Sequence, residues 1–490
     1  MSRARRSASG VDRYDLVVVG GGTGGLVSAL VAAGIGARVA LVERARMGGD
    51  CLWTGCVPSK SLLAAADLAH RMRHADQVGL VACEPVIDFA QVMAHVDEAR
   101  RAIAPQDSVE RLEREGVDVV SGHARFEGPG LISVQGRQLS YRKAIIATGS
   151  RPALPPIPGL AQAQPLTSET VWDVKDRPAS LVVLGGGAIG CELAQGFARL
   201  GSHVTLIEAG DRLLAREEPR ASELIAFRLR AEGIDVRLGA QARVVRSDGT
   251  GGELGVEQPR APARIPFHRL LVAAGRDPST TDLGLGRVGV RTDRRGSVCV
   301  DGRLRTAAAH IFAVGDVTGA LPFTHVAAYH ARVATVNALF GARRRVDYAT
   351  VPRATFTDPE VAAVGLTEAD ARARWNDAEI VSFDYADLDR AVAEGRRYGF
   401  ATLIGDPRGR LVGATIAAPG GAESIAELTA WIATGAKLDR ISQVVHAYPT
   451  LSEGPARAAD AHLRARFAAP RMQRLGGVAL QILGRVDRPR

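Results

Sequence analysis

The hydrophobic pattern is most regular near the N-terminus. Residues 15–19 are mostly apolar, residues 20–25 are five glycines and one threonine, and an alanine-rich apolar stretch follows to about Gly34. A second apolar run, 37–42, ends at Glu43. Short apolar runs bounded by glycine predict buried strands, whereas a longer apolar stretch predicts a helix. This segment therefore predicts a strand, a tight turn, a helix and a second strand.

The same order recurs later in the chain. Apolar residues 181–184 precede the glycine-rich run 185–190, an apolar stretch extends to about Leu200, and a further run, 203–207, ends at Glu208. The chain thus contains an internal duplication of one strand–turn–helix–strand unit.

Each unit carries the G-x-G-x-x-G pattern that binds the pyrophosphate of a dinucleotide. The first glycine permits a tight turn, the second lets backbone amides approach the pyrophosphate, and the third lets the helix pack close to the strand. The pyrophosphate then lies at the helix N-terminus, and the acid that ends the second strand hydrogen-bonds a ribose. Two such units predict two bound dinucleotides. The glycines are Gly20, Gly22 and Gly25 in the first unit and Gly185, Gly187 and Gly190 in the second.

The remaining pattern predicts further strands, two helices and a linker. The strands are expected at 131–134, 141–146, 311–314, 361–364, 400–404 and 411–416, the helices at about 326–339 and 422–434, and a proline-rich linker at 151–158. The block from about 351 to 465 has no glycine fingerprint, so we expect it to supply an interface or a substrate module.

Length and composition are those of ordinary globular proteins. The chain has 490 residues, of which 46% are hydrophobic and 23% charged, and this length suits about two to four domains. No apolar run reaches the ~18 residues of a membrane span, and no apolar stretch follows the charged N-terminus, so neither a transmembrane segment nor a secretory signal is predicted. Five cysteines, an odd and low number, argue against an exported disulfide scaffold and favour the cytoplasm.

The net charge of +9 does not indicate a nucleic-acid partner. The chain has four lysines and 58 arginines, and the basic residues are scattered, so arginine is interpreted as the usual surface cation. The segment 471–490 mixes apolar and basic residues. A loosely ordered tail is favoured there over a helix on a membrane surface or on a partner subunit.

The most informative stretch runs from Cys51 to Lys60. Two cysteines five positions apart, Cys51 and Cys56, can form a disulfide if the backbone between them curls, which Gly55 eases. A helix that begins near Pro58 would stabilise a thiolate through its dipole. A zinc site is the alternative, but it needs about four ligands, and no second Cys or His cluster matches. Lys60 is a candidate site residue, because lysine is rare in this chain and a compact ammonium suits a tight site where a guanidinium does not.

Over residues 14–465 the chain resembles the class I pyridine nucleotide–disulfide oxidoreductases, a family that includes dihydrolipoyl dehydrogenase, glutathione reductase and mercuric reductase. The resemblance implies FAD and either NADH or NADPH as cofactors, no resident metal, and a homodimer. The motifs that carry it are the first glycine fingerprint with Glu43, residues 48–60 and 147–152, the second fingerprint with Glu192, and residues 275–278, 313–316 and 356–360.

The fold implied by the resemblance is α/β, with two Rossmann-like dinucleotide-binding domains, for FAD and NAD(P), and a C-terminal α+β dimerisation domain. The expected parts are the first part of the FAD domain at 14–160, the NAD(P) domain at 161–290, the second part of the FAD or central domain at 291–348, the dimerisation domain at 349–465 and a tail at 466–490.

The resemblance also implies roles for single residues. Cys56 would be the charge-transfer thiol beside the flavin, and Cys51 the thiol that attacks substrate. Lys60 would lie near the flavin N5, paired with Glu192, and Asp316 would bind the ribityl chain. The expected cofactor-binding residues are Gly20, Gly22, Gly25, Glu43, Gly49, Lys60, Thr148, Gly149, Gly185, Gly187, Gly190, Glu208, Gly275, Arg276, Gly315 and Asp316.

The chain departs from the family in its C-terminal motif, His-x-His-Pro-Thr-x-x-Glu, where Tyr448 stands before the proline. In the family the second histidine is the acid–base for the departing thiol, is oriented by the glutamate (here Glu453), and reaches the disulfide of the partner subunit. The pKa of tyrosine is about 10 and that of histidine about 6.5, so Tyr448 is a poor base at neutral pH. His446 is the alternative acid–base, although a structural role is favoured for it. The expected catalytic set is Cys51, Cys56, Lys60, Glu192, Tyr448 and Glu453.

Mercuric reductases also carry tyrosine at this position, which favours a mercuric-reductase-like enzyme with a small-molecule acceptor. They end, however, in a paired-cysteine tail, and no cysteine follows Cys299 here. Dihydrolipoyl dehydrogenase, a quinone-type reductase and a non-enzymatic FAD-binding subunit are the alternatives. Glu208 favours NADH because a carboxylate accepts from a 2′-hydroxyl and repels a 2′-phosphate, although Arg212 could still reach a phosphate.

Overall fold

The computed structural model of the protein describes residues 12–259 and 261–486. The described chain divides into two compact units. The first contains the described parts of 1–73, 83–211 and 230–346, and the second those of 74–82, 212–229 and 347–490. Both segments with a glycine fingerprint therefore belong to the first unit.

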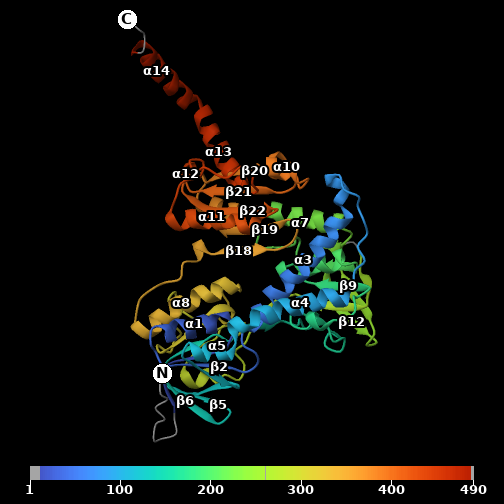
Figure 1. Ribbon diagram of the computed structural model, residues 1–490, viewed down its shortest axis with the longest axis vertical. Coiled ribbons are helices and arrows are strands. Elements are labelled where there is room, and N and C mark those ends of the chain that lie inside the picture. Colours follow the sequence, from blue (N-terminus) through green and yellow to red (C-terminus); the bar gives the residue numbers. More distant parts are fainter. Residues whose placement is uncertain (1–11, 260, 487–490) are drawn as a thin grey trace. The chain divides into compact units, whose positions relative to one another are not determined.

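The first unit contains a seven-stranded sheet (Figure 1). Its parallel strands are β3 (Val117–Ser121), β2 (Val39–Glu43), β1 (Asp12–Val19), β6 (Arg137–Ile146) and β17 (Ile311–Ala313). An antiparallel extension adds β5 (Leu131–Val134) and β4 (Ala124–Gly128). The helix between β1 and β2 is α1 (Thr23–Gly34), which packs against α8 (Thr324–Phe340).

The central strand of this sheet is apolar on both faces. Val17 and Val19 belong to one buried cluster, whereas Leu16 and Val18 belong to another. Successive side chains of a strand point to opposite faces, and parallel sheets are covered on both faces. The continuous apolar run at 16–19 is therefore the pattern of a doubly covered parallel strand.

A second parallel sheet in the same unit repeats this design. Its order is β11 (Asp235–Arg237), β10 (His203–Ile207), β9 (Ser180–Leu184), β15 (Arg269–Val272) and β8 (Leu166–Thr167). The helix between β9 and β10 is α6 (Ala188–Arg199). A separate antiparallel sheet contains β12 (Gln241–Ser247), β13 (Gly252–Glu257) and β14 (Ala263–Phe267). The predicted strand–turn–helix–strand duplication is confirmed.

Further helices of the first unit lie between β2 and β3 in the sequence. They are α2 (Gly49–Trp53), α3 (Cys56–Arg73), α4 (Phe89–Ile103) and α5 (Val109–Arg114), and α3 contacts both α4 and α6. The helix predicted near Pro58 begins at Cys56. The start of the predicted linker 151–158 is a strand and not a loop, because β7 (Ser150–Pro152) pairs antiparallel with β16 (Arg276–Pro278). A proline-rich segment can form such an edge pair, since proline lacks only its own amide donor.

The second unit contains one antiparallel sheet, ordered β18 (Pro352–Thr355), β19 (Glu360–Gly365), β22 (Leu411–Ala418), β21 (Phe400–Gly405) and β20 (Glu379–Asp384). One face is covered by α11 (Gly421–Thr434) and α13 (Glu453–Ala468), which share a buried cluster with the strands. The other helices are α7 (Pro219–Ala231, mostly in this unit), α9 (Glu368–Arg374), α10 (Asp389–Ala393) and α12 (Leu438–Ile441). The α/β fold with a C-terminal α+β part is as predicted.

The C-terminal segment differs from the prediction of a loosely ordered tail. Residues Pro470–Val486 form a helix, α14, which follows α13 directly. Pro470 lies at its first turn, where the missing amide costs nothing. The expected boundary at residue 465 falls inside α13. Among the residues that the structure describes, no helix has both the length and the apolar content required to cross a membrane.

Candidate active site

The two glycine turns have the same backbone geometry. Gly20 and Gly185 each have φ of +110°, a conformation that L side chains rarely adopt. A Cβ atom on Gly25 would lie 1.8 Å from the carbonyl oxygen of Gly20, and one on Gly190 would lie 1.8 Å from that of Gly185. The third glycine of each fingerprint is therefore required by the close packing of helix on strand.

The acids that follow the turns also have matching contacts. Glu43 accepts hydrogen bonds from the amides of Gly21 (2.6 Å) and Ala45 (2.7 Å). Glu208 accepts from the amide of Gly186 and from the amide two residues after itself, each at 2.6 Å. A carboxylate has about four lone-pair sites. Each acid can thus hold its turn and still accept from a ribose hydroxyl.

The first unit has the features that bound dinucleotides require. Gly22 and Gly187 are the N-caps of α1 and α6, and neither helix start has a side-chain cap, so the first helix amides can donate to a pyrophosphate. The hydroxyl of Thr148 is buried with no hydrogen-bond partner among the described residues. These residues fit FAD at the first turn and NAD(P) at the second.

The other predicted cofactor residues lie at the ends of neighbouring elements. Gly49 begins α2, Gly149 precedes β7 and Gly275 precedes β16. Gly315 and Asp316 begin a short 3-10 helix after β17. All of them belong to the first unit.

The two cysteines of the redox segment lie side by side. Cys51 is in α2, Cys56 is the first residue of α3, and both are free thiols. The amides of Thr54 (2.9 Å) and Gly55 (2.6 Å) both donate to the carbonyl of Asp50, which curls the backbone between them. This curl brings the two sulfurs within hydrogen-bonding reach of each other.

The surroundings of the pair favour a thiolate on Cys56. The hydrogen bond from Cys51 lowers the pKa of Cys56, and the Thr324 hydroxyl, 3.3 Å from its sulfur, and the positive charge of Lys60 act in the same direction. The hydrogen bond to Cys56 and burial both raise the pKa of Cys51. Of the two sulfurs, Cys56 is the one that ionises first, and Cys51 keeps its proton.

Lys60 and Glu192 form an ion pair of 2.8 Å between α3 and α6. The carboxylate side chain is only 7% exposed, whereas the lysine is 37% exposed. A buried carboxylate needs a partner, so Glu192 fixes the ammonium on the helix that begins at Cys56.

Arg276 joins the redox segment to the strand pair β7–β16. Its guanidinium is 2.8 Å from the carboxylate of Asp50 and 2.7 Å from the hydroxyl of Ser150, which in turn donates to Asp316 at 2.7 Å. Burial raises the pKa of Asp316. Arg276 therefore holds together residues from three separate segments.

Three residues of this site were missed by the sequence prediction. Asp50 and Ser150 lie next to predicted residues inside the quoted motifs, so their positions carried a signal. Thr324 is the first residue of α8, and a hydroxyl at the start of a predicted helix was the only local sign of it.

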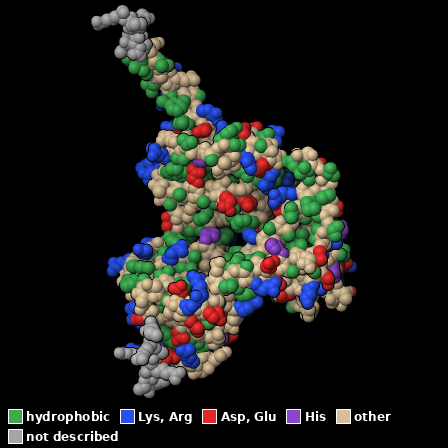
Figure 2. All heavy atoms as spheres, in the orientation of Figure 1, with side chains coloured by type: hydrophobic (Ala, Val, Ile, Leu, Met, Phe, Trp, Pro, Cys, Tyr) green, Lys and Arg blue, Asp and Glu red, His purple; other side chains and the backbone are tan. Residues whose placement is uncertain are grey.

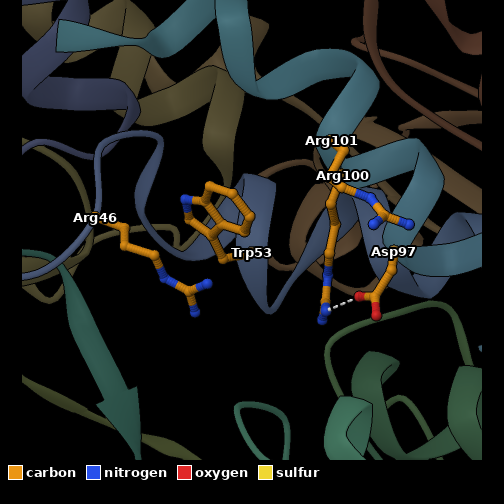
Figure 3. Close-up of a pocket in the computed structure, with 5 residues that line it drawn as sticks. All are labelled: Arg46, Trp53, Asp97, Arg100 and Arg101. Carbon is orange, nitrogen blue, oxygen red and sulfur yellow. Dashed lines mark hydrogen bonds and ion pairs between the residues drawn. The ribbon is translucent and has the colours of Figure 1, made fainter. Parts of the chain in front are cut away.

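An open pocket lies beside the redox segment in the first unit (Figure 3). Arg46 lies over the ring of Trp53, with its guanidinium carbon 4.4 Å from the ring centroid, and Arg100 is bonded to Asp97 at 2.8 Å. Arg101 completes the lining. No predicted site residue lines this pocket, and among the described residues no group of three or more His, Cys, Asp or Glu side chains could hold a metal.

The C-terminal motif lies in the second unit. Tyr448 is 67% exposed, and its hydrogen bond to Asp389 raises the pKa of the phenol. His446 is bound to Glu427 at 3.0 Å. Glu453 is buried and accepts from the amide of Thr450 at 3.2 Å. Within this unit, His446 has a carboxylate partner of its own and Tyr448 projects from the surface.

Comparison with known proteins agrees with this geometry. Residues 14–331 match the pyridine nucleotide-disulphide oxidoreductase family, and residues 351–459 match its dimerisation domain. The chain belongs to this family. Its relatives include a mercuric reductase from Streptomyces lividans, 38% identical over 447 residues, which are 90% of this chain and 94% of that protein. A dihydrolipoyl dehydrogenase from Thermus scotoductus is 36% identical over 458 residues, 91% of this chain and 97% of the relative.

A solved structure, the Cu(II) complex of the HOCl-induced flavoprotein disulfide reductase RclA from Escherichia coli, is similar with a TM-score of 0.82. It is 28% identical, and the match covers 92% of this chain and 99% of that one. The protein is thus an NAD(P)H-dependent FAD disulfide oxidoreductase of class I, as its motifs predicted, with the dimerisation domain of that family.

Proposed function

We propose that this oxidoreductase transfers two electrons from a nicotinamide to a thiophilic metal ion, specifically Hg(II), through the Cys51–Cys56 pair. The single observation that supports this acceptor is Tyr448, which is exposed and has a raised pKa. Reduction of a disulfide substrate requires an acid–base group that protonates the departing thiolate. A metal ion held by two thiolates has no such departing group.

The proposed reaction balances without a further reactant. NAD(P)H gives up two electrons and is released as NAD(P)⁺ with one proton, and Hg(II) takes both electrons to become Hg(0). When bound, FAD supplies the two-electron relay between nicotinamide and sulfur. Thiolates are the preferred protein ligands of such soft metal ions. The comparisons are in keeping with such an acceptor, since the similar proteins include a mercuric reductase and a reductase whose solved structure is a Cu(II) complex.

The proposed roles of the chain's own residues follow from their contacts. Cys56 is the thiolate that faces the flavin, stabilised by Cys51, Thr324 and Lys60. Cys51 keeps its proton until the acceptor binds, and then releases it. Glu192 keeps Lys60 in place. Asp316 and the fingerprint glycines are proposed as cofactor-binding residues.

NADH is the proposed electron donor. Glu208 presents a carboxylate where a 2′-phosphate would otherwise bind. Arg212, the nearest basic residue in sequence, donates to the carbonyls of Ala215 (2.6 Å) and Glu217 (3.1 Å) within its own unit. Its guanidinium is therefore engaged by backbone rather than left for a phosphate.

We also propose a homodimer in the cytoplasm, with the domain boundaries given in the sequence analysis. In that dimer, Tyr448 and Glu453 of one chain would serve the sulfur pair of the other. The low and odd number of cysteines, five, is in keeping with a reducing compartment.

Dihydrolipoyl dehydrogenase is the second candidate function, because Glu208 favours NADH and a relative of that name is 36% identical. An anaerobic titration of the purified flavoprotein with NADH and with NADPH, followed by turnover with Hg(II), Cu(II), lipoamide, glutathione disulfide and a quinone, separates the candidates. The proposal predicts metal-dependent NADH oxidation that is lost in Cys51→Ser. Turnover of lipoamide but not of metal ions would refute it, and quinone turnover that survives Cys51→Ser would point to flavin-only chemistry.

A further inference from the structure

The last helix of the chain, α14, has an apolar face that no described residue covers. In Figure 1 it continues from α13 away from the antiparallel sheet of its unit. All described side chains from Pro470 to Leu483 are exposed. The large apolar ones are between 43% and 72% exposed: Met472, Leu475, Val478, Leu480, Ile482 and Leu483. Exposed apolar side chains gathered on one element mark an interaction surface.

Most of the large apolar side chains of α14 lie on one side of the helix axis. Met472, Leu475 and Ile482 recur at spacings that place them on one side of a helix with about 3.6 residues per turn. Gln473 and Gln481, eight positions apart, lie on the opposite side. At about 1.5 Å per residue, the large apolar side chains from Met472 to Leu483 extend over roughly 17 Å of the helix.

The charge of this region is uniformly positive. No Asp or Glu lies between Asp460 and Asp487, whereas five arginines do: Arg464, Arg466, Arg471, Arg474 and Arg485. Of these, Arg466 pairs with Asp439. A second copy of the same helix would bring like charges together, and paired helices normally carry opposite charges beside their apolar seam. A flat anionic surface matches both the apolar face and the charge.

The sequence of α14 also argues that the helix depends on such a surface. Gly476 and Gly477 lie in its middle, and glycine is the poorest helix former after proline. A 17-residue helix with two central glycines gains little stability from intrinsic propensity, so covering its apolar face would stabilise it.

We propose that α14 lies in the interface of an anionic phospholipid bilayer, with its apolar face toward the acyl chains and Arg471 and Arg474 toward the headgroups. The helix would rest on the bilayer without crossing it. This inference does not depend on the electron acceptor, because no residue of α14 belongs to the proposed active site.

The test is sedimentation of the full-length flavoprotein with vesicles of phosphatidylcholine, with and without phosphatidylglycerol. Two matched double variants each add two negative charges to one face of α14. Leu475→Glu with Ile482→Glu changes the apolar face, and Gln473→Glu with Gln481→Glu changes the polar face. Reduction of the flavin by NADH reports that every variant is folded.

The parent should bind vesicles that contain phosphatidylglycerol, and more weakly at about 1 M than at about 0.1 M salt. The apolar-face variant should lose binding by at least about tenfold, and the polar-face variant by much less. The proposal is overturned if the parent stays in the supernatant, or if both variants lose binding equally. It is also overturned if light scattering shows that the apolar-face variant alone has a smaller oligomer mass, which would make a second copy the occupant of this face.

Discussion

Replacing Thr324 by valine should raise the pKa of the Cys56 thiol from about 6 to about 7. The threonine hydroxyl is 3.3 Å from the sulfur, and it donates to that sulfur once Cys56 is ionised. Valine has nearly the same shape but no donor, so the substitution removes one hydrogen bond from the thiolate and leaves the packing of α8 in place. The hydroxyl stabilises the thiolate more than the thiol, because the ionised sulfur is the stronger acceptor.

The magnitude follows from the energy of that hydrogen bond. A hydrogen bond to a charged group contributes about 1.5 to 3 kcal/mol, and about 1.36 kcal/mol corresponds to one unit of pKa. We take the lower end of the range because Cys51 and Lys60 continue to stabilise the thiolate. In the parent, the thiolate is lost as the pH falls through about 6. In the variant, that loss should begin about one pH unit higher.

The assay is the rate of iodoacetamide alkylation against pH, read by mass spectrometry on the peptide that contains Cys56. A Cys51→Ser background isolates the one thiol and leaves a hydroxyl that can still donate to it. Thr324→Ser is the matched control and should keep the parent pKa. Lys60→Met should raise the pKa through loss of its charge, which shows that the assay responds. An unchanged pKa in Thr324→Val, together with a shift in Lys60→Met, would show that the hydroxyl does not stabilise the thiolate.

Three further predictions test other parts of the proposed enzyme. Tyr448→His should raise lipoamide reductase turnover by about 10²-fold or more, the usual contribution of a positioned acid–base, whereas Tyr448→Phe should not; equal turnover of both variants in steady-state assays would contradict the role assigned to this position. Glu208→Gln should shift the ratio of kcat/KM values toward NADPH by about tenfold or more, because it removes the charge that repels a 2′-phosphate, and an unchanged ratio would remove the basis for NADH preference. Gly25→Ala should lower the free energy of unfolding by about 3 kcal/mol or more, since its Cβ would lie 1.8 Å from a carbonyl oxygen. Gly34→Ala at the end of the same helix should be neutral, because its Cβ would meet nothing within 4 Å. Thermal unfolding and flavin content measure both variants, and equal stability would contradict the close packing.

The matching contacts of the two turns explain how one local design serves two cofactors. In both strand–turn–helix–strand segments, the acid at the end of the second strand accepts hydrogen bonds from a turn amide and from a nearby following amide. These bonds fix the carboxylate before any nucleotide arrives. A carboxylate that is already oriented loses little conformational entropy when a ribose binds.

The sequence by itself determined the features that depend on neighbouring residues. Both strand–turn–helix–strand segments were predicted from glycines at fixed spacing, apolar runs of strand length and an acid at the end of the second run. This was possible because turn conformation and strand burial are local properties. The strands expected at 131–134 and 203–207 are confirmed to the residue. The cysteine spacing likewise predicted a curled redox segment, because its closure depends only on the few residues between the sulfurs.

The tertiary structure decided which distant residues surround that segment. Thr324 contacts Cys56 across 268 positions, and Glu192 reaches Lys60 across 132. Neither spacing by itself carries a signal, because such contacts depend on how α8 and α6 pack after the sheets have formed. The Lys60–Glu192 pair was expected only from the family resemblance. The last helix was also decided by the tertiary structure, because the mixture of apolar and basic residues at 471–490 predicted a loosely ordered tail. Only the folded chain shows that its large apolar side chains are exposed.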